Sequence, residues 1–304
     1  MKHTLSVTMV LVIVFLFIQI FGLYAFSQSM HITTNDNGSR SVSYADTAVG
    51  ERPEIEGAVS LLYILFGILI GTGIVMMFAR FGQVNLWKIM YFMAVWLASA
   101  ITLGVFISPT MAMAVAAVLA LLELVRTNIY IHNITEILIY PGIALLFAPL
   151  FNIYWAAMLL LAISAYDMFA VWKSGHMITL AKFQTGTRAF AGFVVPYGIG
   201  RKGGIKTDIP RGVKVRGMKT AILGGGDIAF PLVFSAVALD WLIRYTGVSL
   251  FHAFLESLII PLFTAAALLA LFVKAEKDKF YPAMPFVTAG CFAGFAVVWL
   301  LSIF

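Results

Sequence analysis

The chain has 304 residues, of which 62% are hydrophobic and only 11% are charged, and its formal net charge is +6. Soluble globular domains carry about 25% charged and about 45–50% apolar residues. A water-soluble fold cannot cover this much apolar surface, so the composition indicates an integral membrane protein. The single cysteine, Cys291, excludes an internal disulfide framework and a metal site built from several cysteines.

Apolar segments long enough to cross a bilayer recur along the chain. A helix needs about 20 predominantly apolar residues to span a hydrocarbon core of about 30 Å. Nine segments meet or nearly meet this criterion: 5–26, 57–79, 86–107, 109–125, 134–151, 153–172, 218–239, 249–273 and 283–304. The sequence therefore predicts an all-α polytopic bundle of nine transmembrane helices, although short junctions at Ser108–Pro109 and Phe151–Asn152 leave the count open by one.

The first segment has two interpretations. Lys2 and His3 precede an apolar run, and small residues follow Tyr24, as in a secretory signal peptide. The run of about 20 residues is longer than the 7–15 of a typical signal sequence. We therefore expect a retained first helix.

Basic residues orient the predicted bundle, because cytoplasmic loops carry the excess of Lys and Arg. With the N-terminus inside, all of the 20 basic residues except Arg40, Arg52 and Arg244 fall on the cytoplasmic side. The predicted topology is N-in/C-out. It divides one membrane domain, 1–304, into six helices over 1–172, a cytoplasmic loop over 173–217 and three helices over 218–304. The polar loop 27–56 is expected outside.

The basic loop 173–217 contains patterns that resemble nucleotide-binding motifs. Residues 198–203 match G-x-G-x-x-G, and residues 200–207 resemble a P-loop. No βαβ pattern surrounds either, so a glycine-rich loop is the better interpretation. The excess of Lys and Arg in cytoplasmic loops and the attraction of basic residues to anionic lipid explain the charge of this loop. No nucleic acid partner is expected. His252 and Glu256 lie four residues apart but lack a second histidine, so they predict no zinc site.

Two aspartates, Asp167 and Asp227, lie well inside apolar segments. A charged residue at the centre of a membrane helix costs about 2.5–3.5 kcal/mol on insertion scales, so such residues are functional candidates. The alternative is a structural polar contact between two helices. We place the other acids, including Glu123, Glu136, Asp240 and Glu256, in loops or at helix ends.

The two aspartates also fall at a similar depth. Asp167 precedes Lys173 by about 9 Å, and Asp227 follows Lys219 by about 12 Å, if both lie on helices with a rise of about 1.5 Å per residue. Because these helices run in opposite directions, both carboxylates are expected near the cytoplasmic face, where they can meet.

Glycine and proline surround this expected meeting point. Gly224, Gly225 and Gly226 precede Asp227 and are expected to weaken the interior of a helix, where a substrate chain could approach. Tyr281-Pro282-Ala283-Met284-Pro285 opens the last segment at the same end of the bundle. A simple helix start explains the prolines of this element when it is taken alone.

Paired aspartates are suited to peptide hydrolysis. Two adjacent carboxyl groups share one proton, so one activates a water molecule while the other polarises the scissile carbonyl. This chemistry requires no metal or organic cofactor. A substrate helix must unwind before cleavage, and Val213–Arg216 alternates like a short strand that could pair with the unwound chain.

Three motifs in this order resemble the signatures of the presenilin and signal peptide peptidase family. They are Tyr166-Asp167, Gly224-Gly225-Gly226-Asp227 and Pro282-Ala283-Met284-Pro285, on predicted segments six, seven and nine. Met284 replaces the family's Leu, a volume-conserving change, and Gly225 occupies the position where presenilins usually have Leu.

The resemblance implies an intramembrane aspartyl endopeptidase with Asp167 and Asp227 as its catalytic pair, site-shaping roles for the other motif residues, and single-span membrane proteins as substrates. It further implies a compact, archaeal homologue in the cell membrane of a prokaryote, which acts without partner subunits and whose active site faces the cytoplasm. The N-in/C-out topology is that of presenilins and implies substrates with an outside N-terminus.

Three rival functions remain open from the sequence. Intramembrane carboxylates and broken helices also occur in cation- or proton-coupled transporters and leak channels, although no internal repeat is evident here. A prepilin-type peptidase shares the Gly-x-Gly-Asp signature but is disfavoured by the Pro-Ala-Met-Pro element. A non-enzymatic scaffold would tolerate asparagine at both aspartates.

Overall fold

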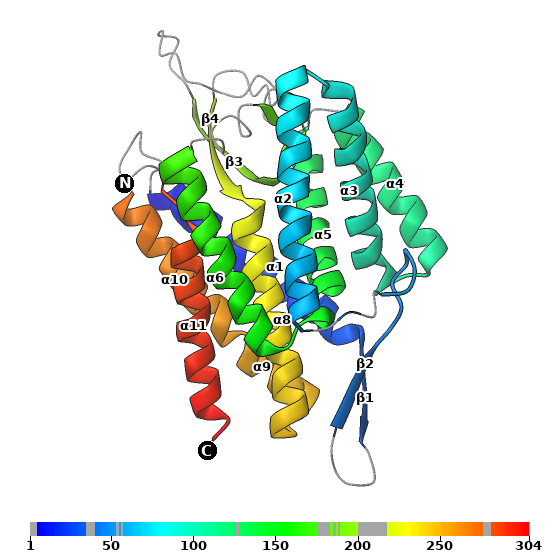
Figure 1. Ribbon diagram of the computed structural model, residues 1–304, viewed down its shortest axis with the longest axis vertical. Helices are drawn as coiled ribbons and strands as arrows, with labels where there is room; N and C mark the ends of the chain where they lie inside the picture. The colour runs from blue at the N-terminus through cyan, green and yellow to red at the C-terminus, as the bar shows by residue number, and fades with distance from the viewer. Residues whose placement is uncertain are drawn as a thin grey trace.

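The computed structural model describes residues 5–34, 40–52, 55, 57–125, 128–174, 183–184, 187, 189–199, 218–275 and 281–303. These residues form an elongated helical bundle with a small β-hairpin at each end (Figure 1). The helices are α1 Leu5–Gln28, α2 Ala58–Phe81, α3 Val84–Gly104, α4 Pro109–Val125, α5 Ile129–Phe147, α6 Ile153–Phe169, α8 Gly225–Thr246, α9 Leu250–Ser257, α10 Ile259–Lys274 and α11 Met284–Leu301.

The predicted number of spans agrees with the structure. Within the described residues, 8 helical spans are long and apolar enough to cross a membrane, and the shorter apolar helix α4 adds one more. Helices α9 and α10 together form one of these spans, Leu250–Lys274. The break between them lies just before Pro261, whose ring nitrogen cannot donate the hydrogen bond that would continue the helix. The predicted polytopic helical bundle is confirmed.

Helix α8 occupies the core of the bundle. Of its most apolar window, 72% is buried inside the protein, whereas only 17% of the corresponding window of α2 is buried. Helices α1, α5, α6, α10 and α11 all pack against α8. Helix α1 contributes fully buried side chains, including Phe15 and Ile18. In the structure α1 is therefore an integral part of the bundle.

The seventh predicted helix begins later than expected. Residues Met218–Gly224 form strand β4, which pairs antiparallel with β3, Gly192–Ile199, and α8 starts only at Gly225. The prediction of a helix from residue 218 is therefore wrong, as is the placement of the three glycines in a helix interior. Distant pairing with β3 decides the conformation of this segment. The proposed strand Val213–Arg216 lies outside the described residues.

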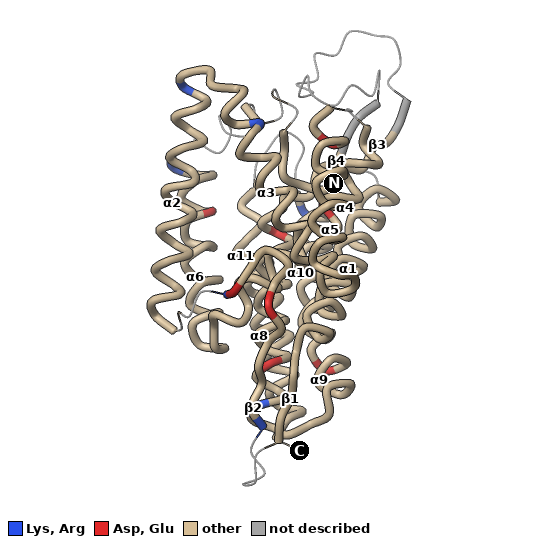
Figure 2. Tube along the Cα trace, turned by 90° about the vertical axis from the view of Figure 1, so that its right-hand side faces the viewer, with Lys and Arg blue, Asp and Glu red and all other residues tan. Residues whose placement is uncertain are grey.

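The second hairpin lies within the predicted outer loop. Strand β1, Met30–Thr34, pairs antiparallel with β2, Arg40–Tyr44. It lies at the end of the bundle opposite β3 and β4 (Figure 1), in agreement with loops 27–56 and 173–217 on opposite sides. Most of the tube between the two ends is uncharged, although several Asp and Glu residues lie along it, as Figure 2 shows.

Polar contacts hold the β1–β2 hairpin against α8. The Tyr44 hydroxyl donates to Asp240 Oδ1 at 2.6 Å, and Arg244 Nε donates to Asp240 Oδ2 at 2.7 Å. Arg244 also donates to the backbone carbonyl of Val42 at 3.0 Å. Burial, followed by the charge of Asp240, raises the pKa of Tyr44, so its phenol keeps the proton that it donates. These contacts assign Asp240 a structural role.

Candidate active site

Asp167 lies near the end of α6, where the helix continues into a wider turn over Ala170–Ser174. Its side chain is buried, and Oδ2 accepts a hydrogen bond from the backbone N–H of Met284 at 3.1 Å. Met284 is the first residue of α11, so the carboxylate faces a helix N-terminus. Unpaired N–H groups and the helix dipole favour negative charge at this position.

The proline element supplies this helix start. Ala283 precedes α11 as its N-cap residue, and Pro285 is the second helical residue. Proline costs little there because first-turn N–H groups have no partner within the helix. The interpretation as a helix start is therefore correct. The structure adds a second property, because the same turn directs an N–H group at Asp167.

A second contact joins α6 and α11 one turn deeper. The hydroxyl groups of Ser164 and Thr288 lie 2.6 Å apart and are buried. Thr288 also lies 3.4 Å from the backbone carbonyl of Leu160. This pair fixes the spacing of the two helices that position Asp167. Sequence reasoning missed it, because single hydroxyl residues in apolar helices carry no distinctive pattern.

Asp227 lies in the first turn of α8 and is half-buried. Gly224 is the N-cap residue of this helix, and the Asp227 carboxylate folds back towards it. A Cβ atom at Gly224 would lie 2.9 Å from Asp227 Oδ2, closer than real Cβ contacts. The glycine at 224 therefore leaves room for the carboxylate.

The next two glycines have different surroundings. A Cβ at Gly225 would lie 3.2 Å from Cε1 of Tyr140 on α5, a tight contact. At Gly226 the nearest atom would be Cε2 of Phe230 at 3.5 Å, an ordinary van der Waals distance. The absence of a side chain thus matters most at Gly224, less at Gly225 and least at Gly226.

The structure places the two aspartates on helices that pack against each other. Helices α6 and α8 pack against each other, and the charge of Asp167 acts on the Asp227 carboxyl group. The depth estimate for Asp227 assumed a helix from Lys219 and was wrong in that respect, but the two side chains do come within electrostatic range. Tyr166, the residue before Asp167, is half-buried on α6.

Two further elements hold the first turn of α8. Gln19 on α1 is buried and donates from Nε2 to the backbone carbonyl of Ile228 at 2.8 Å. Strand β4 runs directly into the helix, with Gly224 opposite Gly192 of β3. Gln19 was not recognised from the sequence, although a glutamine within an apolar first helix is a signal that could have found it.

Comparison with known proteins identifies a protein family for this chain. The family model described as "Signal-peptide peptidase, presenilin aspartyl protease" matches residues 38–303. No curated protein matches the chain.

Two solved structures are similar across the whole fold. A presenilin family intramembrane aspartate protease in a C222 crystal form has a TM-score of 0.58 and 17% identity, covering 97% of this chain and 99% of the other. A presenilin family intramembrane aspartate protease in a P2 crystal form has a TM-score of 0.59 and 17% identity, covering 95% and 96%. At this identity the structures establish the shared fold, and the family model carries the assignment. The chain belongs to the signal-peptide peptidase and presenilin family of intramembrane aspartyl proteases.

Proposed function

We propose that Asp167 and Asp227 form the catalytic dyad of this protease and hydrolyse peptide bonds in single-span membrane proteins. The observation that carries the proposal is the placement of two intramembrane carboxyl groups on the packed helices α6 and α8, within electrostatic range of each other. Asp240, another acid of α8, has structural partners in Tyr44 and Arg244. Asp167 and Asp227 instead lie beside a helix N-terminus and a glycine-rich turn.

The dyad needs one proton and one water molecule. Two carboxyl groups in near contact cannot both ionise, so the pair holds a shared proton. The ionised member removes a proton from water, and the protonated member donates a hydrogen bond to the scissile carbonyl. The N–H of Met284 helps to stabilise negative charge on Asp167 during this exchange. No metal ion takes part in these steps.

The hairpin gives the unwound substrate a surface on which to bind. A transmembrane substrate satisfies its backbone groups within its own helix and loses those bonds when it unwinds. Strands β3 and β4 form a two-stranded sheet, so each has an edge that is not paired within it. An extended substrate can add to such an edge, and β4 leads directly to Asp227. The described strand Met218–Gly224 takes the role that we expected of Val213–Arg216.

The site opens towards the cytoplasm in this proposal. The N-in/C-out topology places the start of α8 and the end of α6 on the cytoplasmic side, together with the β3–β4 hairpin. Water then reaches the dyad over a short path. The whole chain acts as one membrane domain in the cell membrane of a prokaryote, without partner subunits, and substrates enter with their N-terminus outside.

Cleavage by purified variants tests the proposal. Wild-type protein in detergent should cut a single-span substrate, whereas Asp167→Asn and Asp227→Asn should each lose at least about 100-fold in rate, the lower range for removal of an acid–base group. Asp240→Asn is the matched control, because Asp240 lies on α8 but serves the contact with β2, and asparagine keeps one acceptor oxygen for Tyr44 or Arg244.

The same assay separates the protease from its rivals. A transporter or leak channel using these acids would show Asp-dependent ion flux in proteoliposomes and no cleavage. Cleavage that survives in either Asp→Asn variant would exclude the proposed dyad, because an asparagine can neither accept the proton from water nor share one.

A further inference from the structure

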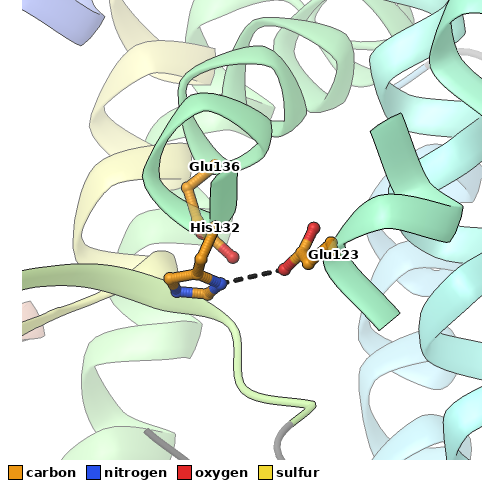
Figure 3. Close-up of side chains that lie close together, drawn as sticks. All are labelled: Glu123, His132 and Glu136. Atoms are coloured by element: carbon orange, nitrogen blue, oxygen red, sulfur yellow. Dashed lines mark hydrogen bonds and ion pairs between the residues drawn. The ribbon is translucent and has the colours of Figure 1, made fainter. Parts of the chain in front are cut away.

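Three titratable side chains other than the aspartate pair meet between α4, α5 and β3. They are Glu123 of α4 and His132 and Glu136 of α5, and Figure 3 shows them converging from the two helices. One ligand atom from each lies within 4.8 Å of the others. Glu123 and Glu136 are buried, and the His132 side chain is 14% exposed. Burying three such groups is costly, so the cluster requires an explanation.

The hydrogen bonds of His132 define what can lie between it and Glu123. Its Nε2 atom is 2.8 Å from the backbone carbonyl of Gly192, which only accepts, so Nε2 carries a hydrogen atom. Its Nδ1 atom faces Glu123 Oε1 at 2.9 Å. A neutral imidazole with hydrogen on Nε2 presents a lone pair at Nδ1. Two electron-pair donors then face each other, so a cation, either a proton or a metal ion, must bind between them.

Donors orient the carboxylates of this cluster. The Tyr91 hydroxyl donates to Glu123 Oε1 at 2.5 Å, and Thr135 Oγ1 donates to Glu123 Oε2 at 2.5 Å. Metal-binding histidines usually donate from their second ring nitrogen to a carbonyl or carboxylate, and metal-binding carboxylates also accept hydrogen bonds. His132 and Glu123 have supporting contacts of this kind.

Glu136 leaves one oxygen open towards the cluster. Its Oε2 accepts a hydrogen bond from Tyr140. The Gly192 backbone also lies close to this carboxylate, yet Oε1 has no hydrogen-bond partner among the described residues. An unpartnered carboxylate oxygen in a fully buried residue costs free energy unless something binds it.

Charge favours a divalent ion over a proton. With a neutral imidazole, the two carboxylates give the cluster a charge of −2. A proton on His132 leaves a net negative charge in an apolar bundle, and a second proton, on Glu136, would be needed to neutralise it. A single divalent cation neutralises both carboxylates and gives Oε1 of Glu136 a partner.

We propose that Glu123, His132 and Glu136 bind a zinc ion, with a water molecule as the fourth ligand. One imidazole and two carboxylates are ligands that zinc accepts, and bond lengths of about 2.0–2.2 Å place tetrahedral ligand atoms about 3.4 Å apart. Ligand atoms within 4.8 Å reach this geometry through small side-chain shifts. The ion reaches the site from the membrane surface, since Glu123 is close to the end of α4 and His132 is in the first turn of α5.

The bound ion would fasten the hairpin to the bundle. His132 holds β3 through Gly192, and Gly192 pairs with Gly224 at the start of the turn that carries Asp227. Tyr140, which donates to Glu136, lies beside Gly225, where its ring leaves little room for a Cβ atom. The zinc site is thus a structural anchor beside the active site and takes no part in the chemistry of the aspartates.

Direct metal analysis tests the site without an activity assay. Wild-type protein, stripped with a chelator and dialysed against Zn²⁺ alone, should retain about one zinc ion per chain. His132→Ala and Glu136→Gln should weaken Zn²⁺ binding at least about 100-fold, the upper range for losing even a residue that supports a ligand. His252→Ala, which removes an exposed imidazole bonded to Ser249, should leave it unchanged.

Cobalt provides a second measurement that does not depend on His132→Ala folding. Co²⁺ in the wild-type site should give the intense visible absorption of a tetrahedral ion, and the near-isosteric Glu136→Gln change should remove it. Wild-type protein that retains no zinc would overturn the proposal in favour of a protonated His132. Zinc that persists equally in Glu136→Gln and His132→Ala would place the ion elsewhere and also overturn it.

Discussion

Gly224 illustrates how a single missing side chain shapes the candidate site. Any Cβ at this position meets the Asp227 carboxylate, whereas Gly226, two residues later, has room for one. The sequence showed three consecutive glycines and offered no means of ranking them. Their separate roles depend on α8 beginning at Gly225, which local sequence did not reveal.

We therefore expect Gly224→Ala and Gly226→Ala to behave differently. The first should displace the Asp227 carboxylate and lower the cleavage rate at least about tenfold, which corresponds to about 1.4 kcal/mol of lost transition-state stabilisation. The second should retain a rate within about threefold of wild type. Rates of substrate cleavage by folded, purified variants measure the difference. Equal rates for the two variants would show that the contact at Gly224 is unimportant.

Glu136 is a residue whose position the sequence analysis misjudged. The sequence placed it near the end of a segment starting at residue 134, but α5 begins at Ile129 and buries Glu136 completely. The four-residue spacing of His132 and Glu136 on one helix was available as a signal. Glu123 could not be added to them from sequence, because its approach depends on how α4 packs against α5.

At the scale of elements, hydrophobic segments were predictable and the β3–β4 hairpin was not. A run of about 20 apolar residues has one stable form in lipid, a helix, so length alone identifies it. Met218–Gly224 is short and mixed, and its strand form depends on pairing with residues 192–199. The link between α6 and α11 likewise comes from packing, through Ser164 and Thr288.

Removal of one hydroxyl group tests that link. Ser164→Ala should destabilise the protein by about 0.6 kcal/mol, the average for a hydrogen bond between membrane helices. It should also reduce activity, because α11 carries the N–H group that binds Asp167. Ser302→Ala is a suitable control, since Ser302 is partly exposed and bonds only to the nearby Trp299 carbonyl. Unfolding in detergent measures stability; equal stability of Ser164→Ala and wild type would argue against the link.

At the scale of the whole molecule, composition alone identified a membrane protein, and the number of spans followed from their lengths. The order of the three motifs along these spans led to the family that the comparisons support. Orientation rests on basic residues, which report sidedness through the membrane potential and insertion machinery rather than through contacts in the fold.

Cysteine labelling in intact membranes tests that orientation. The native Cys291 is fully buried, so it should remain unlabelled and serve as an internal background. An impermeant thiol reagent applied from outside should label Ser43→Cys on β2 and should not label Gln83→Cys between α2 and α3, both exposed positions. Permeabilised membranes should give labelling of both. The reverse pattern in intact membranes would invert the topology.

The most direct test of the central claim is the activity of the double variant. If Asp167 and Asp227 act as one unit, Asp167→Asn, Asp227→Asn and the double variant should have the same residual cleavage rate, because losing either member removes the shared proton and the base together. Losses that instead multiply in the double variant, or a single variant that keeps substantial activity, would contradict a catalytic dyad formed by these two residues.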